Sequence, residues 1–170
     1  MNTPLRRAER SLSSVVVPQN ILFFYEKPLE KEHSRNMYLS VHYFSPFVDN
    51  PTNTHSPISV QKQQQFNSCT HYYHSKKFET LGAEKEMRQI LSISSPEEAY
   101  ERSKMLEVPY FNIPKWKDWE ERKVDVMRTA IRLKFEQNPT LMEKLLMTGD
   151  KSLIEDHPHD SFWFALYSHE

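Results

Sequence analysis

Hydrophobic residues recur every three or four positions along the last third of the chain, a spacing that predicts helices there. The first predicted helix runs from Asp118 to Gln137. The second starts at Asn138, which favours the N-cap, and Pro139, which suits the first turn. Gly149 is placed to end this helix in a left-handed conformation. The hydrophobic faces hold Val124, Met127, Ala130, Ile131 and Phe135 in the first helix and Leu141, Leu145 and Leu146 in the second.

Three further helices are predicted in the middle of the chain. Ser68 can cap a helix over 69–79, and residues 84–93 place their hydrophobic side chains on one side. Ser95 and the proline after it start the third of these helices with a cap and a first-turn proline. The segment 108–117 carries two prolines among aromatic residues, and we expect it to be a rigid connector.

Short runs of β-forming residues lie in the first third of the chain. Strands are expected over 21–25, 38–47 and 58–60, with an exposed loop at 48–56 and a polar connection at 61–65. A few strands followed by many helices are typical of an α+β protein. We therefore predict a predominantly helical single domain with a small N-terminal β-sheet. Its expected parts are a flexible segment at 1–19, the domain at 20–165 and a C-terminal end at 166–170.

Composition narrows the class of protein. A chain of 170 residues suits one domain with a hydrophobic core. The net charge of -1 and the isoelectric point near 6.7 argue against an extended nucleic-acid surface. No hydrophobic run approaches the roughly 20 residues of a membrane helix. The chain has 2 glycines, which excludes the phosphate-binding loops that need several residues without a Cβ.

Cysteine content and the N-terminus bear on the compartment. Cys69 is the single cysteine, so no internal disulfide can form. We therefore expect an intracellular protein, cytoplasmic or nuclear. Arg6, Arg7 and Arg10 faintly resemble a mitochondrial leader, but Glu9 counts against one.

The predicted helix 69–79 carries the first candidate site. Thr70, His74 and Lys77 are spaced to share one face, with Tyr73 beside them. A lysine held among aromatic side chains can lose its charge and act as a nucleophile toward a carbonyl carbon. The alternative is a solvated helix lysine beside core aromatic residues, and the spacing is compatible with both.

An acidic turn near the C-terminus is the second candidate. Glu155, Asp156 and Asp160 follow a short hydrophobic run and precede Trp163. Carboxylates beside an aromatic ring can stabilise the positively charged sugar that forms when a glycosidic bond breaks. Solvated loop carboxylates would give the same pattern.

Histidines suggest a third candidate, a metal site. His71 and His74 could join His157, His159 or the nearby carboxylates, but zinc needs about four such ligands in a tetrahedral array. His71 and His74 have no third ligand near them in the sequence, and His157 and His159 flank a proline. We therefore expect no metal and no cofactor.

The sequence as a whole resembles a known family, most strongly in its second half. The segments VMRTAIRLKFEQNP and LLMTGDKSLIED, followed by Asp160 and Trp163, are similar in order and spacing to the NADAR family of N-glycosidases. Residues 44–47 resemble that family's Phe-Ser-Asn-Phe segment. Residues 70–78 resemble its Glu-His-Tyr-Phe-Gln-Ala-Gln-Lys-Phe helix.

The resemblance implies an activity and a site. The family acts on ADP-ribose-type and riboflavin-precursor substrates and cleaves the N-glycosidic bond between ribose and a base, without a metal. Lys77 matches the lysine that attacks the anomeric carbon of the ring-opened sugar to form a Schiff base. Asp160 and Glu155 match its acidic positions. The resemblance also implies ligand contacts at Phe44, Phe66, Tyr73 and Trp163.

The sequence departs from the family where chemistry is expected. Thr70 replaces the helix glutamate and cannot ionise, and loss of a general acid or base commonly costs about 10² to 10⁴ in rate. The family's glycine-rich C-terminal segment has no counterpart in this sequence. Further departures are Pro46 for asparagine, Phe66 and Asn67 for Trp-Pro, Ser103 and Lys104 for Gly-Arg, and Phe164 for glycine.

Two functional hypotheses follow. The first is a degenerate member, its N-glycosidase activity lost or weakened, that binds an ADP-ribose-like nucleotide or a protein partner covering the uncapped C-terminal side. The alternative is an active N-glycosidase that uses Lys77 with Asp160 or Glu155 on ADP-ribosylated guanine or a related nucleotide. Thr70 favours the first hypothesis and Lys77 favours the second.

Overall fold

The computed structural model describes residues 21–25, 33–49 and 64–156, where far more residues lie in helices than in strands. The predicted α+β class with a predominance of helix is confirmed. Several expectations fall outside the described residues. They concern the N-terminal segment 1–19, the strand at 58–60, the end at 166–170, and Asp160, Trp163 and Phe164.

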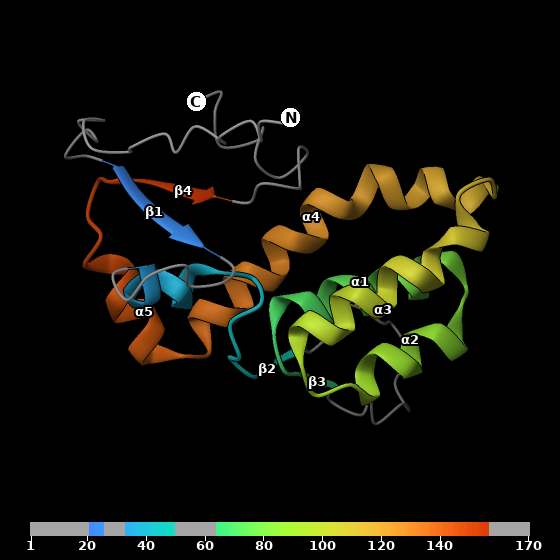
Figure 1. Cartoon of the computed structure of the whole chain (residues 1–170), viewed down its shortest axis with the longest axis horizontal. Coiled ribbons are helices and arrows are strands. Elements are labelled where there is room, and N and C mark those ends of the chain that lie inside the picture. The colour runs from blue at the N-terminus through green and yellow to red at the C-terminus, as the bar shows by residue number, and fades with distance from the viewer. Residues whose placement is uncertain (1–20, 26–32, 50–63, 157–170) are drawn as a thin grey trace, which may run out of the picture.

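Helix α1 (Cys69–Leu81) lies at the centre of the helical group at one end of the molecule (Figure 1). It packs against α2 (Glu84–Ser92), α3 (Pro96–Glu107) and α4 (Pro114–Glu136). Because three helices cover α1, its polar side chains Thr70, His74 and Lys77 are buried along with its hydrophobic ones. The main core between these helices includes Phe47, Phe66, Tyr72, Tyr73, Phe78, Ile90, Trp119 and Met127.

Two separate two-stranded sheets accompany the helices. β1 (Ile21–Tyr25) pairs in parallel with β4 (Ser152–Asp156), and β2 (Phe47–Asp49) pairs in antiparallel fashion with β3 (Gln64–Phe66). The expectation of one sheet drawn mainly from the N-terminal third is therefore wrong in one respect. β1 takes its partner from the other end of the described chain.

A second, smaller core lies beneath the β1–β4 pair, where α5 (Pro139–Leu146) and the 3₁₀ helix η1 (His33–Leu39) meet. Helix α4 runs between the two ends of the molecule (Figure 1). Residues from Trp119 to Ala130 of this helix lie in the main core, and Phe135 near its C-terminal end lies in the smaller one. The buried side chains of the smaller core are Phe24, Tyr38, Leu39, Phe135 and Leu141.

The strand expected over 38–47 is replaced by the end of η1 and a turn. Ser40 Oγ accepts a hydrogen bond from the His42 backbone N–H at 3.2 Å, and Lys134 Nζ donates to the Ser40 carbonyl at 2.7 Å. These bonds occupy polar groups that a strand would use for pairing. Strand β2 begins at Phe47, so only the last residue of the expected strand lies in a strand of the structure.

Other boundaries also shift from the prediction. β2 takes up the first residues of the expected loop at 48–56, and β3 begins inside the polar connection expected at 61–65. The connector expected at 108–117 contains a short 3₁₀ helix, η2 (Val108–Tyr110), and the start of α4. At β2 and β3, backbone pairing extends into residues whose side chains are typical of loops. At η2 and α4, a proline in the first turn starts a helix within the expected connector.

Most helix ends follow the predicted signals. The Ser68 and Ser95 side chains accept hydrogen bonds from backbone N–H groups in the first turns of α1 and α3. Gly149 has a φ of +59°, the left-handed conformation expected after the last helix. Gly82, with a φ of +73°, is the C-cap of α1, whereas α5 ends at Leu146 with Met147 as its C-cap, before Gly149.

The start of α5 differs from the prediction. The Asn138 side chain makes no capping bond. Its amide instead donates to the carbonyl oxygens of Pro46 at 3.2 Å and Lys134 at 2.7 Å, which ties the end of α4 to the segment before β2. Leu141 is buried as predicted, but Leu146 is 72% exposed, so the buried face of α5 is narrower than its leucines indicate.

Candidate functional site

One face of α1 buries three polar side chains. Thr70, His74 and Lys77 lie on it, as their spacing predicts, and each is less than a tenth exposed. Buried polar and charged groups cost free energy unless partners satisfy them. The partners come from α3 and from the turn after η1, and together these groups form the candidate site.

Lys77 forms a buried ion pair with Glu107, the last residue of α3. The lysine is 4% exposed, and its Nζ lies 5.7 Å from the ring centre of Tyr73 and 5.9 Å from that of Trp119. Burial lowers the pKa of Lys77, and the Glu107 carboxylate opposes that shift. The alternative of a solvated lysine is therefore wrong, and the amine lies closer to its neutral, nucleophilic form than a surface lysine does.

His74 lies between Thr70 and Lys77 along α1. Its Nδ1 is buried and has no hydrogen-bond partner among the described residues. Its ring centre is 5.1 Å from that of Tyr73 and 5.9 Å from that of Tyr100. Burial, and after it the positive charge of Lys77, holds the pKa of His74 well below its ordinary value. The ring is therefore neutral at pH 7.

Thr70 is bound to the turn that follows η1. Its Oγ1 donates to the Val41 carbonyl at 3.1 Å and lies 3.1 Å from Nδ1 of His42. The Thr70 backbone N–H donates to the same carbonyl at 3.2 Å. A neutral hydroxyl bonded to an imidazole thus occupies the position where the resembling motif has a carboxylate.

Tyr100 of α3 connects the two ends of this face. Its ring centre is 5.6 Å from that of His42, and Lys104 Nζ lies 5.6 Å from the same ring centre. Lys104 Nζ is in turn 3.6 Å from the Glu107 carboxylate. The polar groups therefore form one continuous cluster between α1, α3 and the turn after η1.

Sequence patterns do not single out Glu107 or His42. Glu107 ends a helix, where carboxylates are ordinarily solvated, and His42 stands in a run expected to be a strand. Each joins the site by touching a residue of α1 that lies 28 or 30 positions away in the sequence. No local signal could have identified either residue.

The sequence patterns also do not single out a second buried lysine, Lys134 of α4. It is 1% exposed, its Nζ donates to the Ser40 carbonyl, and it lies 5.6 Å from the ring centre of Tyr43. Burial lowers the pKa of Lys134 to about 8, and the half-buried Glu155 of β4 is among the groups that oppose the shift. The predicted acidic residue Glu155 therefore acts electrostatically on Lys134, which anchors the turn carrying His42.

The predicted ligand contacts fall in different settings. Tyr73 is buried beside Lys77. Phe66 is buried in the main core, where its ring centre is 4.9 Å from that of Tyr72. Phe44 is 59% exposed on the turn after η1. The structure thus places Tyr73 beside Lys77 and packs Phe66 against Tyr72 in the main core. That these residues and Phe44 contact a ligand stays a prediction.

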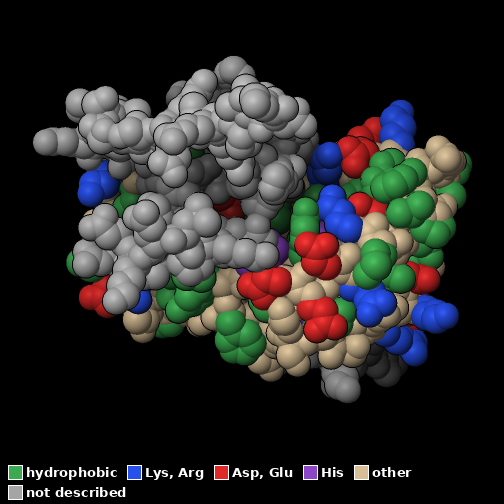
Figure 2. Space-filling view, viewed as in Figure 1, with side chains coloured by type: hydrophobic (Ala, Val, Ile, Leu, Met, Phe, Trp, Pro, Cys, Tyr) green, Lys and Arg blue, Asp and Glu red, His purple; other side chains and the backbone are tan. Residues whose placement is uncertain are grey.

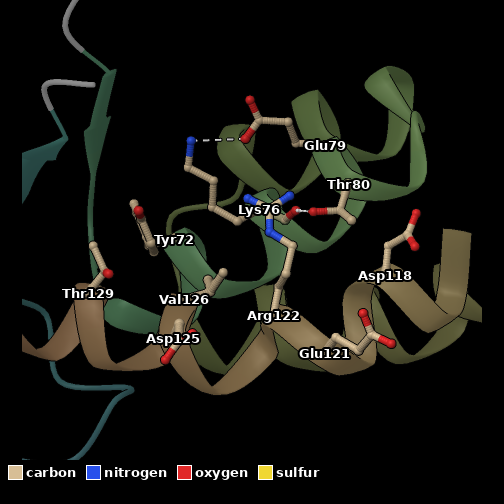
Figure 3. A pocket seen from close by; sticks show the side chains of 10 residues that line it. All are labelled: Tyr72, Lys76, Glu79, Thr80, Asp118, Glu121, Arg122, Asp125, Val126 and Thr129. Carbon is tan, nitrogen blue, oxygen red and sulfur yellow. Dashed lines mark hydrogen bonds and ion pairs between the residues drawn. The ribbon is translucent and has the colours of Figure 1, made fainter. Parts of the chain in front are cut away.

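A groove of about 830 Å³ lies between α1 and α4 (Figure 3). Lys76 spans part of its rim and pairs with Glu79 at 2.9 Å. The α1 residues that line the groove project from a different face of the helix than Lys77 does. The groove is therefore separate from the polar cluster around Lys77. The groove is lined by Tyr72, Lys76, Glu79, Thr80, Asp118, Glu121, Arg122, Asp125, Val126 and Thr129.

Three wider properties of the described residues bear on ligands. No group of three or more His, Cys, Asp or Glu side chains among them is arranged to hold a metal ion. None of the described helices has the length and hydrophobicity needed to cross a membrane. Figure 2 shows acidic and basic side chains interspersed over the described part of one face, which suits a compact ligand better than a long polyanion.

The fold and site define a small, mostly helical α+β domain in which a buried lysine of the central helix α1 pairs with a carboxylate of α3. The profile of the NADAR domain matches residues 23–169. The chain belongs to the NADAR domain family, as the sequence motifs predicted.

Known proteins that resemble the chain share its motifs over part of their length. It is 37% identical to N-glycosidase YbiA of Escherichia coli (strain K12) over 111 residues, which cover 63% of this chain and 61% of that protein. It is 33% identical to riboflavin biosynthesis protein PYRR, chloroplastic, of Zea mays over 117 residues, or 64% of this chain and 19% of that protein. The chain thus spans less than two thirds of either relative.

A solved structure supports the same fold. The NMR structure of the E. coli protein YbiA superimposes with a TM-score of 0.58 at 25% sequence identity. The superposition covers 87% of this chain and 74% of that one. The arrangement of helices and small sheets is therefore that of a NADAR domain.

Proposed function

We propose that the protein is an N-glycosidase that hydrolyses the bond between a ribose and a nitrogenous base. The observation that carries the proposal is the buried pair of Lys77 and Glu107. A buried ion pair contributes little to stability, whereas titratable groups with displaced pKa values cluster at functional sites. Relatives named N-glycosidases support this reaction at the level of the family.

The contacts of Lys77 suit a nucleophilic mechanism. The Glu107 carboxylate touches Nζ and is placed to accept a proton from it. The neutral amine then bonds to C1′ of the ring-opened sugar, the C1′–N bond breaks, and the base leaves carrying a proton. Water adds to the resulting imine and restores the free amine and the sugar aldehyde. The sum is the addition of one water molecule across the N-glycosidic bond.

ADP-ribosylated guanine or a related nucleotide is the proposed substrate. This assignment follows from the family motif that contains Lys77 and from the balanced charge of the chain, which suits a small ligand. Glu155 and Asp160 are the proposed acidic partners, and Phe44 and Trp163 the proposed contacts to the nucleotide.

Binding without hydrolysis is the second candidate function, and Thr70 is the observation that favours it. The Thr70 hydroxyl is held by Val41 and His42 and cannot ionise. The protein would then retain an ADP-ribose-like nucleotide or dock a protein partner. Leu146 and Met147, which are 72% and 80% exposed, offer hydrophobic surface at the C-terminal end of α5 for such a partner.

Incubation with ADP-ribosylated guanosine tests the proposed reaction. In the Lys77→Arg variant the guanidinium keeps a positive charge for Glu107 but cannot lose a proton to become a nucleophile. We expect release of ADP-ribose to fall by about 10³-fold or more. Lys76→Arg is the matched control, because it changes the neighbouring residue on the outer face of α1, and it should keep the wild-type rate.

Trapping of the covalent intermediate gives an independent test. Reduction with borohydride during turnover should attach the sugar irreversibly to the peptide that contains Lys77, as measured by mass spectrometry. The Lys76→Arg protein should show the same adduct, and the Lys77→Arg protein should not. If the wild-type protein releases no base yet binds ADP-ribose in a calorimetric titration, the binding candidate replaces the enzymatic one.

A further inference from the structure

Exposed hydrophobic side chains follow one another where α3 ends. The backbone stays helical from α3 through η2 as far as Phe111. Met105, Val108 and Phe111 are spaced three residues apart along it, which places them on one face. They are 61%, 60% and 45% exposed. These three residues form the hydrophobic corner, which lies at the opposite end of the molecule from β1 and β4 (Figure 1).

The hydrophobic corner takes no part in the packing of α3. The inner side of this helix buries Ala99, Ser103 and Glu107, which are spaced four residues apart. Met105 and Val108 project from the other side of the helix. A group of exposed hydrophobic side chains on an otherwise packed domain marks a surface that contacts something else.

The backbone and rings of the corner are held in place before anything binds. Pro109 and Pro114 fix the backbone φ on either side of Phe111. The Phe111 ring packs edge to face on Trp116, with ring centres 4.7 Å apart. A surface that is already ordered loses little conformational entropy when it docks.

Three lysines border the hydrophobic corner. Lys104 stands before it on α3, Lys115 and Lys117 follow it in the first turn of α4, and all three are exposed. The segment 104–117 contains one carboxylate, Glu107, which is buried. The exposed side chains of this segment therefore carry positive charge without an exposed negative charge among them. Figure 2 shows hydrophobic side chains gathered at this end of the molecule, with basic side chains at their edge.

This combination matches the chemistry of an anionic membrane surface. Hydrophobic and aromatic side chains enter the boundary between headgroups and acyl chains, while lysine stems let their ammonium groups reach the phosphates. A nucleic acid would use the lysines but offers no hydrocarbon to Met105 and Val108. Exposed carboxylates at Glu101 and Asp118 stand on either side of the segment, so contact is confined to the corner itself.

We propose that the hydrophobic corner and its three lysines bind the surface of an anionic phospholipid membrane. The contact is peripheral, because none of the described helices can cross a membrane. It does not depend on the N-glycosidase function proposed above. Val108 directly follows Glu107, so docking brings the Lys77–Glu107 pair close to the lipid surface.

Co-sedimentation of the full chain with vesicles tests the proposal. We expect binding to phosphatidylcholine vesicles that contain phosphatidylserine, weaker binding to phosphatidylcholine alone, and a loss of affinity as salt is added. Val108→Ser should weaken binding about tenfold, because a hydrophobic side chain no longer enters the lipid. Lys117→Gln should weaken it about fivefold. Met147→Ser is the matched control, since Met147 is equally hydrophobic and exposed but lies at the other end of the molecule, and it should bind as the wild type does.

A fluorescent label gives a second measurement that does not depend on affinity. Cys69, the single cysteine, is fully buried, and burial raises the pKa of its thiol to about 11, so it should not react with a maleimide in the folded protein. An environment-sensitive dye on the Val108→Cys variant should shift to the blue when phosphatidylserine vesicles are added. The same dye on Met147→Cys should not shift, and wild-type protein serves as the labelling blank.

Three results would overturn the proposal. The first is a wild-type protein that stays in solution with phosphatidylserine vesicles at low salt. The second is binding that Val108→Ser leaves unchanged or that Met147→Ser weakens equally, because the corner would then not be the contact. The third is a blue shift of the dye on Val108→Cys that follows protein concentration without vesicles, which would assign the corner to contact between two copies of the chain.

Discussion

Lys134 places an amine in the interior of the protein, with its Nζ 2.7 Å from the Ser40 carbonyl. Burial lowers the pKa of Lys134 to about 8, whereas a lysine in an unfolded chain has a pKa of about 10.4. Between these values the unfolded chain binds more protons than the folded one. The contribution of this residue to stability therefore rises with pH from about 8 to about 10.

Comparison of the wild-type protein with a Lys134→Met variant should reveal this dependence. From pH 7 to pH 9 we expect Lys134 to add about 1.3 kcal/mol to the free energy of unfolding, at ~1.4 kcal/mol per pKa unit. The variant should lack that increment in urea titrations at the two pH values. The upper limit of pH 9 avoids Tyr72, whose pKa is raised by burial and acts with the opposite sign above pH 10. An equal rise in both proteins would contradict the assignment.

At the scale of elements, the junction of α4 and α5 depends on a side chain with an unexpected role. An asparagine that caps a helix accepts a hydrogen bond, so aspartate replaces it well. The Asn138 amide instead donates to the carbonyls of Pro46 and Lys134. A carboxylate at this position would face two carbonyl oxygens and repel both.

The Asn138→Asp substitution distinguishes these roles. We expect it to destabilise the protein by about 1 to 3 kcal/mol, because two donated bonds are lost and an acceptor is left facing acceptors. Thermal or urea unfolding measures the change, with Ser95→Asp as the control at a true N-cap, where little loss is expected. A neutral effect of Asn138→Asp would return the residue to the capping role that its sequence position predicts.

Elements governed by local rules were predictable from the sequence. The caps at Ser68 and Ser95 and the left-handed Gly149 depend on neighbours within a few positions, and each was found where expected. The pairing of β1 with β4 and the approach of His42 to Thr70 depend on contacts between distant segments. Single-sequence patterns carry no signal for such contacts, which explains why the face of α1 was predicted and its partners were not.

At the scale of the whole molecule, the two hydrophobic cores meet at Ile131, which packs against both. Phe24 of β1 is buried in the smaller core and lies opposite Glu155 in the register of the parallel pair. The smaller core is built from segments near both ends of the described chain, whereas α1 packs against α2, α3 and α4 from its middle part. The two regions should therefore open at different free energies.

The Phe24→Ala substitution tests this difference. It should lower the global stability by about 3 to 5 kcal/mol, through lost burial and the cavity left behind. Hydrogen exchange measured by mass spectrometry should accelerate most in α5 and β4, with smaller changes in α1. Uniform acceleration throughout the described chain would show instead that the two cores unfold as one cooperative unit.

The parallel pairing of β1 and β4 has a practical consequence for work with shortened forms of the protein. A form that starts after Tyr25 lacks the strand to which β4 is hydrogen-bonded, and β4 becomes an open edge with Leu153 on it. Open edges recruit strands from other chains, so such a form should self-associate. Its acidic residue Glu155 would also lose its fixed register, so an inactive shortened protein would say nothing about the chemistry of the whole one.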